Sequence, residues 1–269
     1  MGAYNMEYLV LQEIINQVKN NRTAALVIIT DREDSTPREK GSIMAVFQDG
    51  STFGTIGGGN LEYSAIKSAK ECMRTGEDKS YFYDLSDGGN LDMQCGGKTN
   101  VFIKVFKPRY KLLIVGGGHI ALTLCKLGKM LDFYVTIFDN REEYCNIERF
   151  PQADELIVGD IEEKLKEYEI DNNCYIVIVT HGHRYDEVAL KTVINRNAAY
   201  VGMIGSKKKN EHIKLNLIDE GVGEKLLEQV YAPIGINFGG KTPEHIAFSI
   251  MAEILAVQGN DNLSHLKDL

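Results

Sequence analysis

The sequence lacks the segments that would place the protein in a membrane or mark it for export. No apolar run approaches the roughly 18 residues that a membrane-spanning helix needs, so we expect no membrane association. Residues 1–8 contain no basic stretch of the kind that opens a signal peptide. The five cysteines form no Cys-x-x-Cys pair, and no segment is repeated. We therefore expect a cytoplasmic protein with reduced thiols.

Proline and net positive charge are also scarce. Proline occurs five times, whereas 43% of the residues are hydrophobic and 25% are charged, a composition typical of globular proteins. The 30 Lys and Arg residues against 38 Asp and Glu residues give a formal net charge of −8, so we expect no binding to nucleic acid. With 269 residues, the chain is long enough for two ordinary domains.

Residues 1–107 predict a mixed α/β domain. Apolar residues at helical spacing over residues 9–18 predict an amphipathic helix, and residues 24–30 predict a buried strand. After Gly57-Gly58-Gly59 a second helix is expected, with Asn60 as its N-cap and Gly76 as its stop. Further strands are predicted over residues 42–47, 52–56, 81–85 and 101–106, the first two joined by an Asp-Gly hairpin turn.

Residues 108–269 follow a different pattern, in which strands alternate with helices. Lys107-Pro108-Arg109 is the predicted linker between the two parts. The strands are expected over residues 111–115, 133–138, 153–158, 174–180 and 198–204, and the helices over 119–131, 186–195, 207–220 and from Thr242 onward. Such alternation predicts a Rossmann-like domain with a mainly parallel sheet covered on both faces.

The segment Gly116-Gly117-Gly118-His119-Ile120-Ala121 lies between a predicted strand and a predicted helix. Gly116 permits the tight turn, Gly118 lets a phosphate approach the backbone, and Ala121 allows close packing of helix and strand. Asp139 closes the next strand, 23 residues after Gly116, where a carboxylate can bind a ribose hydroxyl. The segment therefore predicts a site for a pyrophosphate-containing dinucleotide, with His119 in the binding loop. A Rossmann-like fold that binds no nucleotide is the alternative.

Two glycine-rich segments of the first domain are further candidates for binding. Gly57-Gly58-Gly59 and the run Cys95-Gly96-Gly97 can both present backbone amides to an anion, although glycines that merely form turns are an equal alternative. Cys95 lies in a polar loop, where a thiol can react or bind a soft metal, while an inert thiol is the other reading. Cys72, Cys125 and Cys174 fall in apolar segments and are predicted to lie in cores.

Polar residues also follow the later strands of the second domain. His181 and His183 come after a buried strand and share a face if the segment is extended. We favour contact with a ligand over a metal site because no third metal ligand lies nearby in the sequence. Ser206 is predicted to cap a helix that opens with three lysines, which makes a second anion site or a solvated basic helix face.

These segments together resemble the XdhC/CoxI family of xanthine dehydrogenase accessory proteins. The matching motifs occur in the family's order at residues 35–38, 41–44, 54–62, 93–97, 116–121, 138–141, 179–183, 202–207, 232–235 and 242–244. One departure is Asn60, since many family members have cysteine there. Cys95 keeps its motif position and is the remaining candidate thiol for molybdenum.

The resemblance implies a chaperone more than a turnover enzyme. Family members bind molybdenum cofactor, as molybdopterin or its dinucleotide, protect it during sulfuration and help to insert it into an apo molybdenum hydroxylase such as xanthine dehydrogenase. The implied partners are that hydroxylase and a cysteine desulfurase, and we expect a homodimer. The alternatives are an NAD(P)-dependent oxidoreductase that uses the Gly116 loop, and an interaction subunit with a relict Rossmann fold.

Overall fold

The computed structural model describes residues 3–33, 38–86 and 97–260. The chain forms two compact units, Met1–Pro108 and Arg109–Leu269. Each unit has its own sheet and its own hydrophobic cores. In the described part of the chain, every helix is too short or too polar to cross a membrane.

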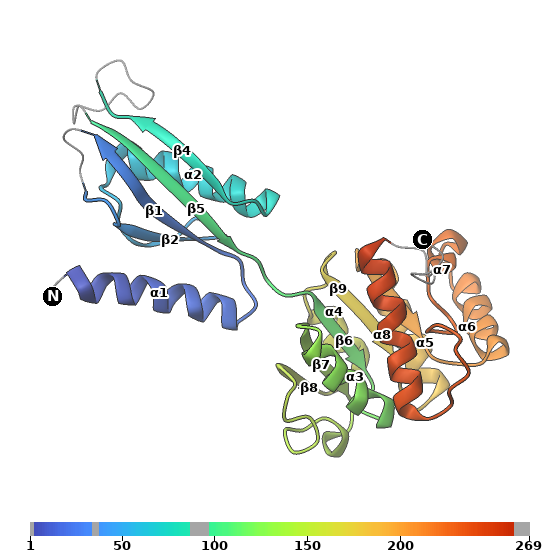
Figure 1. Ribbon diagram of the computed structural model, residues 1–269. Coiled ribbons are helices and arrows are strands. Elements are labelled where there is room, and N and C mark those ends of the chain that lie inside the picture. The colour runs from blue at the N-terminus through green and yellow to red at the C-terminus, as the bar shows by residue number, and fades with distance from the viewer. Residues whose placement is uncertain (1–2, 34–37, 87–96, 261–269) are drawn as a thin grey trace, which may run out of the picture. The chain divides into compact units, whose positions relative to one another are not determined.

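The first unit is a five-stranded antiparallel sheet with one helix on each face (Figure 1). Its strand order is β3-β2-β1-β5-β4. Along β1, Ala25, Val27 and Ile29 pack toward α2, while Ala24 and Leu26 pack toward α1, as the alternation of a strand requires. The elements are α1 (Ala3–Lys19), β1 (Ala24–Glu33), β2 (Ile43–Phe47), β3 (Thr52–Gly54), α2 (Gly59–Thr75), β4 (Lys79–Asp84) and β5 (Lys98–Phe106).

The helix boundaries of this unit differ in part from the sequence-based prediction. Helix α1 begins at Ala3, six residues before the predicted start. The prediction of Asn60 as N-cap is wrong, because Gly58 occupies the cap position and Asn60 lies within α2. The predicted stop at Gly76 is confirmed: it adopts the left-handed conformation, and its N–H bonds to the carbonyl of Cys72.

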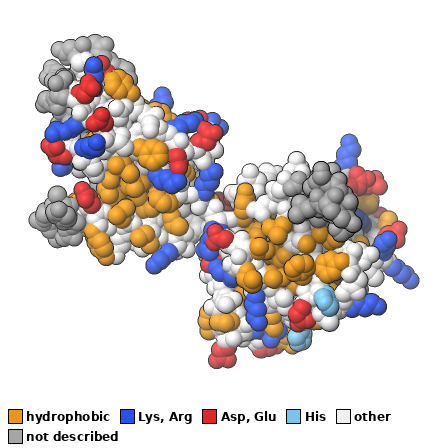
Figure 2. Space-filling view, in the orientation of Figure 1, with side chains coloured by type: hydrophobic (Ala, Val, Ile, Leu, Met, Phe, Trp, Pro, Cys, Tyr) orange, Lys and Arg blue, Asp and Glu red, His pale blue; other side chains and the backbone are white. Residues whose placement is uncertain are grey.

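Apolar side chains remain exposed on the α1 side of this unit. Tyr8, Leu11 and Ile15 on α1 are 62%, 44% and 51% exposed, and Phe82 on the edge strand β4 is 53% exposed. Figure 2 shows apolar side chains gathered on one face of this unit. Patches of this kind commonly mark contacts with other proteins.

The second unit is a five-stranded parallel sheet with the order β10-β9-β6-β7-β8. In chain order this is the 3-2-1-4-5 arrangement of a Rossmann fold, whose connections reverse direction between β6 and β9. The predicted mixed α/β and Rossmann-like fold classes are thereby confirmed. The elements are β6 (Lys111–Val115), α3 (His119–Met130), β7 (Tyr134–Asp139), the 3₁₀ turn η1 (Glu142–Tyr144), β8 (Glu155–Val158), α4 (Ile161–Glu167), β9 (Cys174–Ile178), α5 (His183–Val193), β10 (Tyr200–Met203), α6 (Lys207–Asp219), α7 (Glu224–Glu228) and α8 (Pro243–Gly259).

Helices cover both faces of this sheet, as the alternating pattern predicts. Helices α3 and α8 pack on one face, while α4, α5 and α6 pack on the other. The short helices α4 and α7 were not predicted, because segments of seven and five residues carry little periodicity. Beyond β10, Tyr231 bridges Gly202 in parallel register, at the place of a sixth Rossmann strand.

Candidate functional site

The loops that follow β6 and β9 touch each other at the point where the sheet reverses direction. Gly116 has a φ of 112°, and a Cβ there would lie 2.5 Å from the carbonyl oxygen of Val179 and 2.8 Å from Cα of Thr180. Only glycine satisfies both the turn and this close approach. We call residues 116–119, 139–141 and 180–182, at the ends of β6, β7 and β9, the switch-point loops. Open α/β sheets bind their ligands at this position.

The two helices that start from these loops have no capping side chain. Gly118 is the N-cap of α3 and Gly182 is the N-cap of α5, and neither offers a side-chain acceptor. By contrast, Asp160, Ser206 and Thr242 cap α4, α6 and α8 with their own oxygen atoms. Uncapped helix starts present amides and a positive dipole end to an anion.

Neither the backbone conformation nor the packing around residue 118 requires a glycine. Its φ of −71° suits any residue, and a Cβ would have no neighbour within 4 Å. The absence of a side chain therefore leaves open space over the start of α3, where a phosphate can approach the backbone. His119 is exposed beside this space, while Ala121 is fully buried against the sheet.

Asp139 is placed at the switch-point loops, but its carboxylate already has partners. The side chain is 2% exposed, and it accepts hydrogen bonds from Gly117 N (2.7 Å) and from Arg141 N, Nε and Nη2 (2.9–3.0 Å). Burial alone would raise the pKa of Asp139, but the hydrogen bonds from Arg141 and Gly117 lower it below the ordinary value. The ribose contact predicted for Asp139 would have to share these oxygen atoms with the loop.

Two arginines and an asparagine that sequence reasoning did not select lie around the same glycines. Arg149 Nε donates to the carbonyl oxygen of Gly117 at 2.9 Å, whereas its buried Nη2 has no partner in the described structure. The buried Oδ1 of Asn140 is likewise without a partner there. Arg141 lies over the ring of Tyr144 at 3.8 Å. Unsatisfied buried groups are uncommon and suit a site that a polar ligand completes.

The β9 loop is held by a buried acid. Asp186 is fully buried, accepts from Thr180 N (3.2 Å) and Thr180 Oγ1 (2.6 Å), and pairs with Lys209. His181 is exposed, with its ring 5.1 Å from that of Tyr185. The expectation of an extended segment through His183 is wrong, because His183 is the first residue of α5; its side chain lies outside the described part of the structure.

Ser206 caps α6 as predicted, since its Oγ accepts from Lys209 N at 3.2 Å. Ser206 follows β10, one strand further from the switch point than β9. Its position next to Lys209 brings it close to the buried pair of Lys209 and Asp186.

In the Gly57-Gly58-Gly59 turn, the amides of Gly57 and Gly58 already have an acceptor within the chain, so the expectation of open amides is corrected for these two residues. The Oε1 atom of Glu62 accepts from Ile56 N (3.0 Å), Gly57 N (3.2 Å) and Gly58 N (2.9 Å), and from the Thr55 hydroxyl. The turn is thus an anion-binding concavity filled by a carboxylate of the chain itself. An acid in the first turn of a helix, just after a glycine run, is the signal that could have revealed it.

This carboxylate predicts a stability effect that depends on pH. Burial raises the pKa of Glu62, but the bonds from Thr55, Gly58, Ile56 and Gly57 outweigh it and hold the pKa below its ordinary value of 4.5. The stabilisation is therefore present above about pH 4.5 and is lost as the pH falls through the lowered pKa. We expect Glu62→Gln to lower the free energy of unfolding by about 2 to 3 kcal/mol at pH 7, because several donors lose a charged acceptor.

Urea unfolding of Glu62→Gln and wild type from pH 7 to pH 3 checks this expectation. The difference between the two proteins should shrink at the acid end. Glu71→Gln is a matched control on the same helix, since the Glu71 side chain is exposed and pairs with Arg74. A loss that is equal for both variants, or independent of pH, would contradict the role assigned to Glu62.

The thiol candidate and its neighbour lie outside the described residues. Cys95 and Gly96 belong to residues 87–96, whereas Gly97 is described, is buried and accepts from Leu85 N at 2.8 Å. Cys72, Cys125 and Cys174 are buried, which confirms their predicted core positions. Within the described ranges, no group of three or more His, Cys, Asp or Glu side chains is arranged as metal ligands would be.

The chain thus forms two compact units, and the second has Rossmann topology with an uncapped glycine loop at its switch point. The model of the XdhC Rossmann domain matches residues 112–254, and the model of the XdhC and CoxI family matches residues 17–84. The chain belongs to the XdhC and CoxI family.

Several known proteins are similar to the chain over much of its length. An uncharacterized protein from Escherichia coli K12, YqeB, is 30% identical over 90% of this chain, and a probable xanthine dehydrogenase subunit from Bacillus subtilis is 30% identical over 58%. The matches span 45% and 46% of those two proteins, so the chain corresponds to less than half of each. The molybdenum cofactor insertion chaperone PaoD from E. coli K12 is 20% identical, with 93% of this chain and 88% of PaoD covered.

A solved structure shows the same fold. A Bacillus halodurans protein described as a xanthine dehydrogenase superposes with a TM-score of 0.53 at 19% identity, covering 94% of this chain and 96% of that one. At this identity the likeness concerns the arrangement of the chain alone.

Proposed function

We propose that the chain binds molybdenum cofactor and delivers it to an apo molybdenum hydroxylase of the xanthine dehydrogenase type. The cofactor is cargo in this account, and the chain acts as a maturation factor. The observation that carries the proposal is the pair of uncapped helix starts, α3 and α5, at the switch-point loops. Family membership and the similarity to a protein named as a molybdenum cofactor insertion chaperone support the choice of cargo.

The residues present suit the phosphate end of such a cargo. The amides at the start of α3 lie beside the open space at Gly118, and the unsatisfied Nη2 of Arg149 can donate to a phosphate oxygen. An exposed imidazole at His119 is next to them. We propose His181 and Asn140 as further contacts, since both lie on the loops that end β9 and β7.

The NAD(P)-dependent alternative fits the site less well. A nicotinamide dinucleotide site of this type uses a free acid at the end of the second strand for the ribose hydroxyls. Here Arg141 makes two side-chain hydrogen bonds to that acid, Asp139. Fluorescent pterin oxidation products released from the purified protein would support the chaperone function, whereas nicotinamide absorbance in the near ultraviolet would support the oxidoreductase.

We further propose that sulfuration of the cargo involves a cysteine desulfurase and that Cys95 is the thiol that takes part in this chemistry. Burial raises the pKa of Cys125, Cys145 and Cys174 to about 11. At pH 8 roughly one thiol in a thousand would then be a thiolate. Cys72 is fully buried, with its Sγ 3.4 Å from the Tyr81 hydroxyl.

Alkylation of the native chain at pH 8 should accordingly label Cys95 first, as peptide mass spectrometry can show. Cys95→Ser should remove the fast-reacting thiol with little change in melting temperature. Rapid labelling of any of the four buried cysteines, with Cys95 unmodified, would contradict this assignment.

We also propose a homodimer, for which the exposed apolar side chains of α1 offer a protein-binding face.

A further inference from the structure

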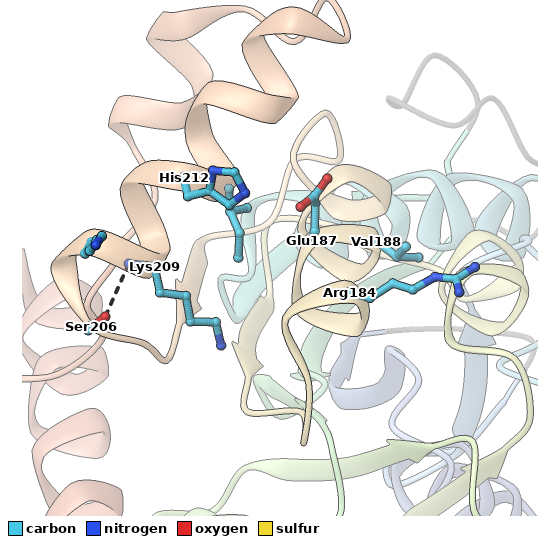
Figure 3. A pocket seen from close by; sticks show the side chains of 8 residues that line it. Arg184, Glu187, Val188, Ser206, Lys209 and His212 are labelled. Atoms are coloured by element: carbon cyan, nitrogen blue, oxygen red, sulfur yellow. Dashed lines mark hydrogen bonds between the residues drawn. The ribbon is translucent and has the colours of Figure 1, made fainter.

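A cavity of about 780 Å³ lies between α5 and α6 in the second unit. Figure 3 shows its lining side chains, which come from the first two turns of both helices and from Ser206, the N-cap of α6. None of them belongs to the switch-point loops. The volume is within the range of pockets that hold small-molecule ligands.

The lining is basic and partly apolar. Arg184 from α5 and Lys208, Lys209 and His212 from α6 surround the cavity, together with the apolar side chains of Val188 and Ile213. Among the described lining residues, the carboxylate of Glu187 already accepts a hydrogen bond from Asn216 Nδ2 at 3.2 Å. The lining therefore carries an excess of positive charge beside an apolar surface.

Three of these groups have no partner within the described residues. The side chains of Arg184, Lys208 and His212 form no ion pair or hydrogen bond there, whereas Lys209 pairs with Asp186. Because Ser206 caps α6, the helix end alone does not define the site. The unpaired cations and the cavity are two independent features that point to an anion.

We propose that this cavity is a second ligand site, for a small phosphate ester whose ring packs against the half-buried side chain of Val188. Its phosphate binds to the unpaired cations of the lining, and the imidazole of His212 provides a further donor. Lys209 contributes through its charge while it remains paired with Asp186. The cavity lining includes Arg184 in the first turn of α5 but no residue of the switch-point loops, and this proposal does not depend on the function proposed for them.

Calorimetry with the full chain tests the proposal, with AMP, inorganic pyrophosphate and adenosine as probes. AMP should bind more tightly than adenosine, because the phosphate supplies charge-assisted hydrogen bonds. The double variant Arg184→Gln/Lys208→Gln should weaken AMP binding by about tenfold or more. The matched control is Lys207→Gln/Lys214→Gln, which removes two charges from α6 outside the cavity lining and should bind AMP as wild type does.

A third variant separates this site from the switch-point loops. Gly118→Val should leave AMP binding at the cavity within about twofold of wild type. Absence of AMP binding, equal affinity of the two double variants, or a loss of AMP binding in Gly118→Val as large as in the cavity variant would each overturn the proposal.

Discussion

Replacing Gly118 with valine is expected to weaken binding of molybdenum cofactor at least about 100-fold, which corresponds to about 2.8 kcal/mol. The branched side chain would fill the open space above the start of α3, where the proposed phosphate lies against the backbone. The protein itself should remain folded, because the φ of −71° is allowed for valine and a Cβ meets no neighbour. Calorimetry with cofactor isolated from a molybdoenzyme measures the affinity, and a melting curve checks the fold.

Gly223 provides a matched control for this substitution. It is also an N-cap glycine, with a φ of −64° and no atom within 4 Å of an added Cβ, but it precedes α7, away from the switch-point loops. Gly223→Val should therefore bind cofactor like wild type. Equal affinity of a folded Gly118→Val and Gly223→Val would show that the phosphate does not approach α3.

Removal of Asp186 is expected to cause the largest loss of stability. Asp186→Ala leaves Lys209, whose side chain is 16% exposed, without its counter-charge, and it leaves Thr180 N without its acceptor. Breaking a buried pair in this way typically costs about 3 to 5 kcal/mol. Urea unfolding measures this loss, and replacement of both partners, Asp186→Asn with Lys209→Met, should recover part of it.

An exposed ion pair between α5 and the C-cap of α6 serves as the control. Glu220 pairs with Lys191, and their side chains are 46% and 54% exposed. Glu220→Ala should have a much smaller effect, as is usual for exposed pairs. If Asp186→Ala and Glu220→Ala destabilise the chain equally, the pair of Asp186 and Lys209 does not hold the β9 loop.

The elements of the fold followed from local patterns wherever a segment was long and periodic. The parallel strands β6 and β9 are short β-branched or apolar runs, and the helices α3, α6 and α8 begin where the capping or glycine signals stand. The start of α5 was missed by three residues, because Gly182 and the contact of Asp186 with Thr180 fix it through the fold. The hydrogen bond between Thr180 and Asp186 could not be predicted from the spacing of residues in the sequence.

The sequence predicted where the candidate site lies, but it did not predict which side chains pair with each other there. The glycine loop, Asp139 and the end of β9 lie at the predicted edge of the sheet. Three hydrogen bonds depend on how the loops fold back on the chain. Arg141 donates to Asp139, Gly58 N donates to Glu62, and Arg149 donates to the carbonyl oxygen of Gly117. The partner of a charged side chain is set by the folded structure, so spacing along the chain could not reveal these pairings.

Mass spectrometry of the small molecules released from freshly purified wild-type and Gly118→Val protein tests the central claim most directly. The account predicts a molybdopterin or its dinucleotide with molybdenum in the wild-type sample, and a strongly reduced amount in the variant. A nicotinamide dinucleotide in the wild-type sample, or molybdopterin retained equally by both proteins, would contradict it.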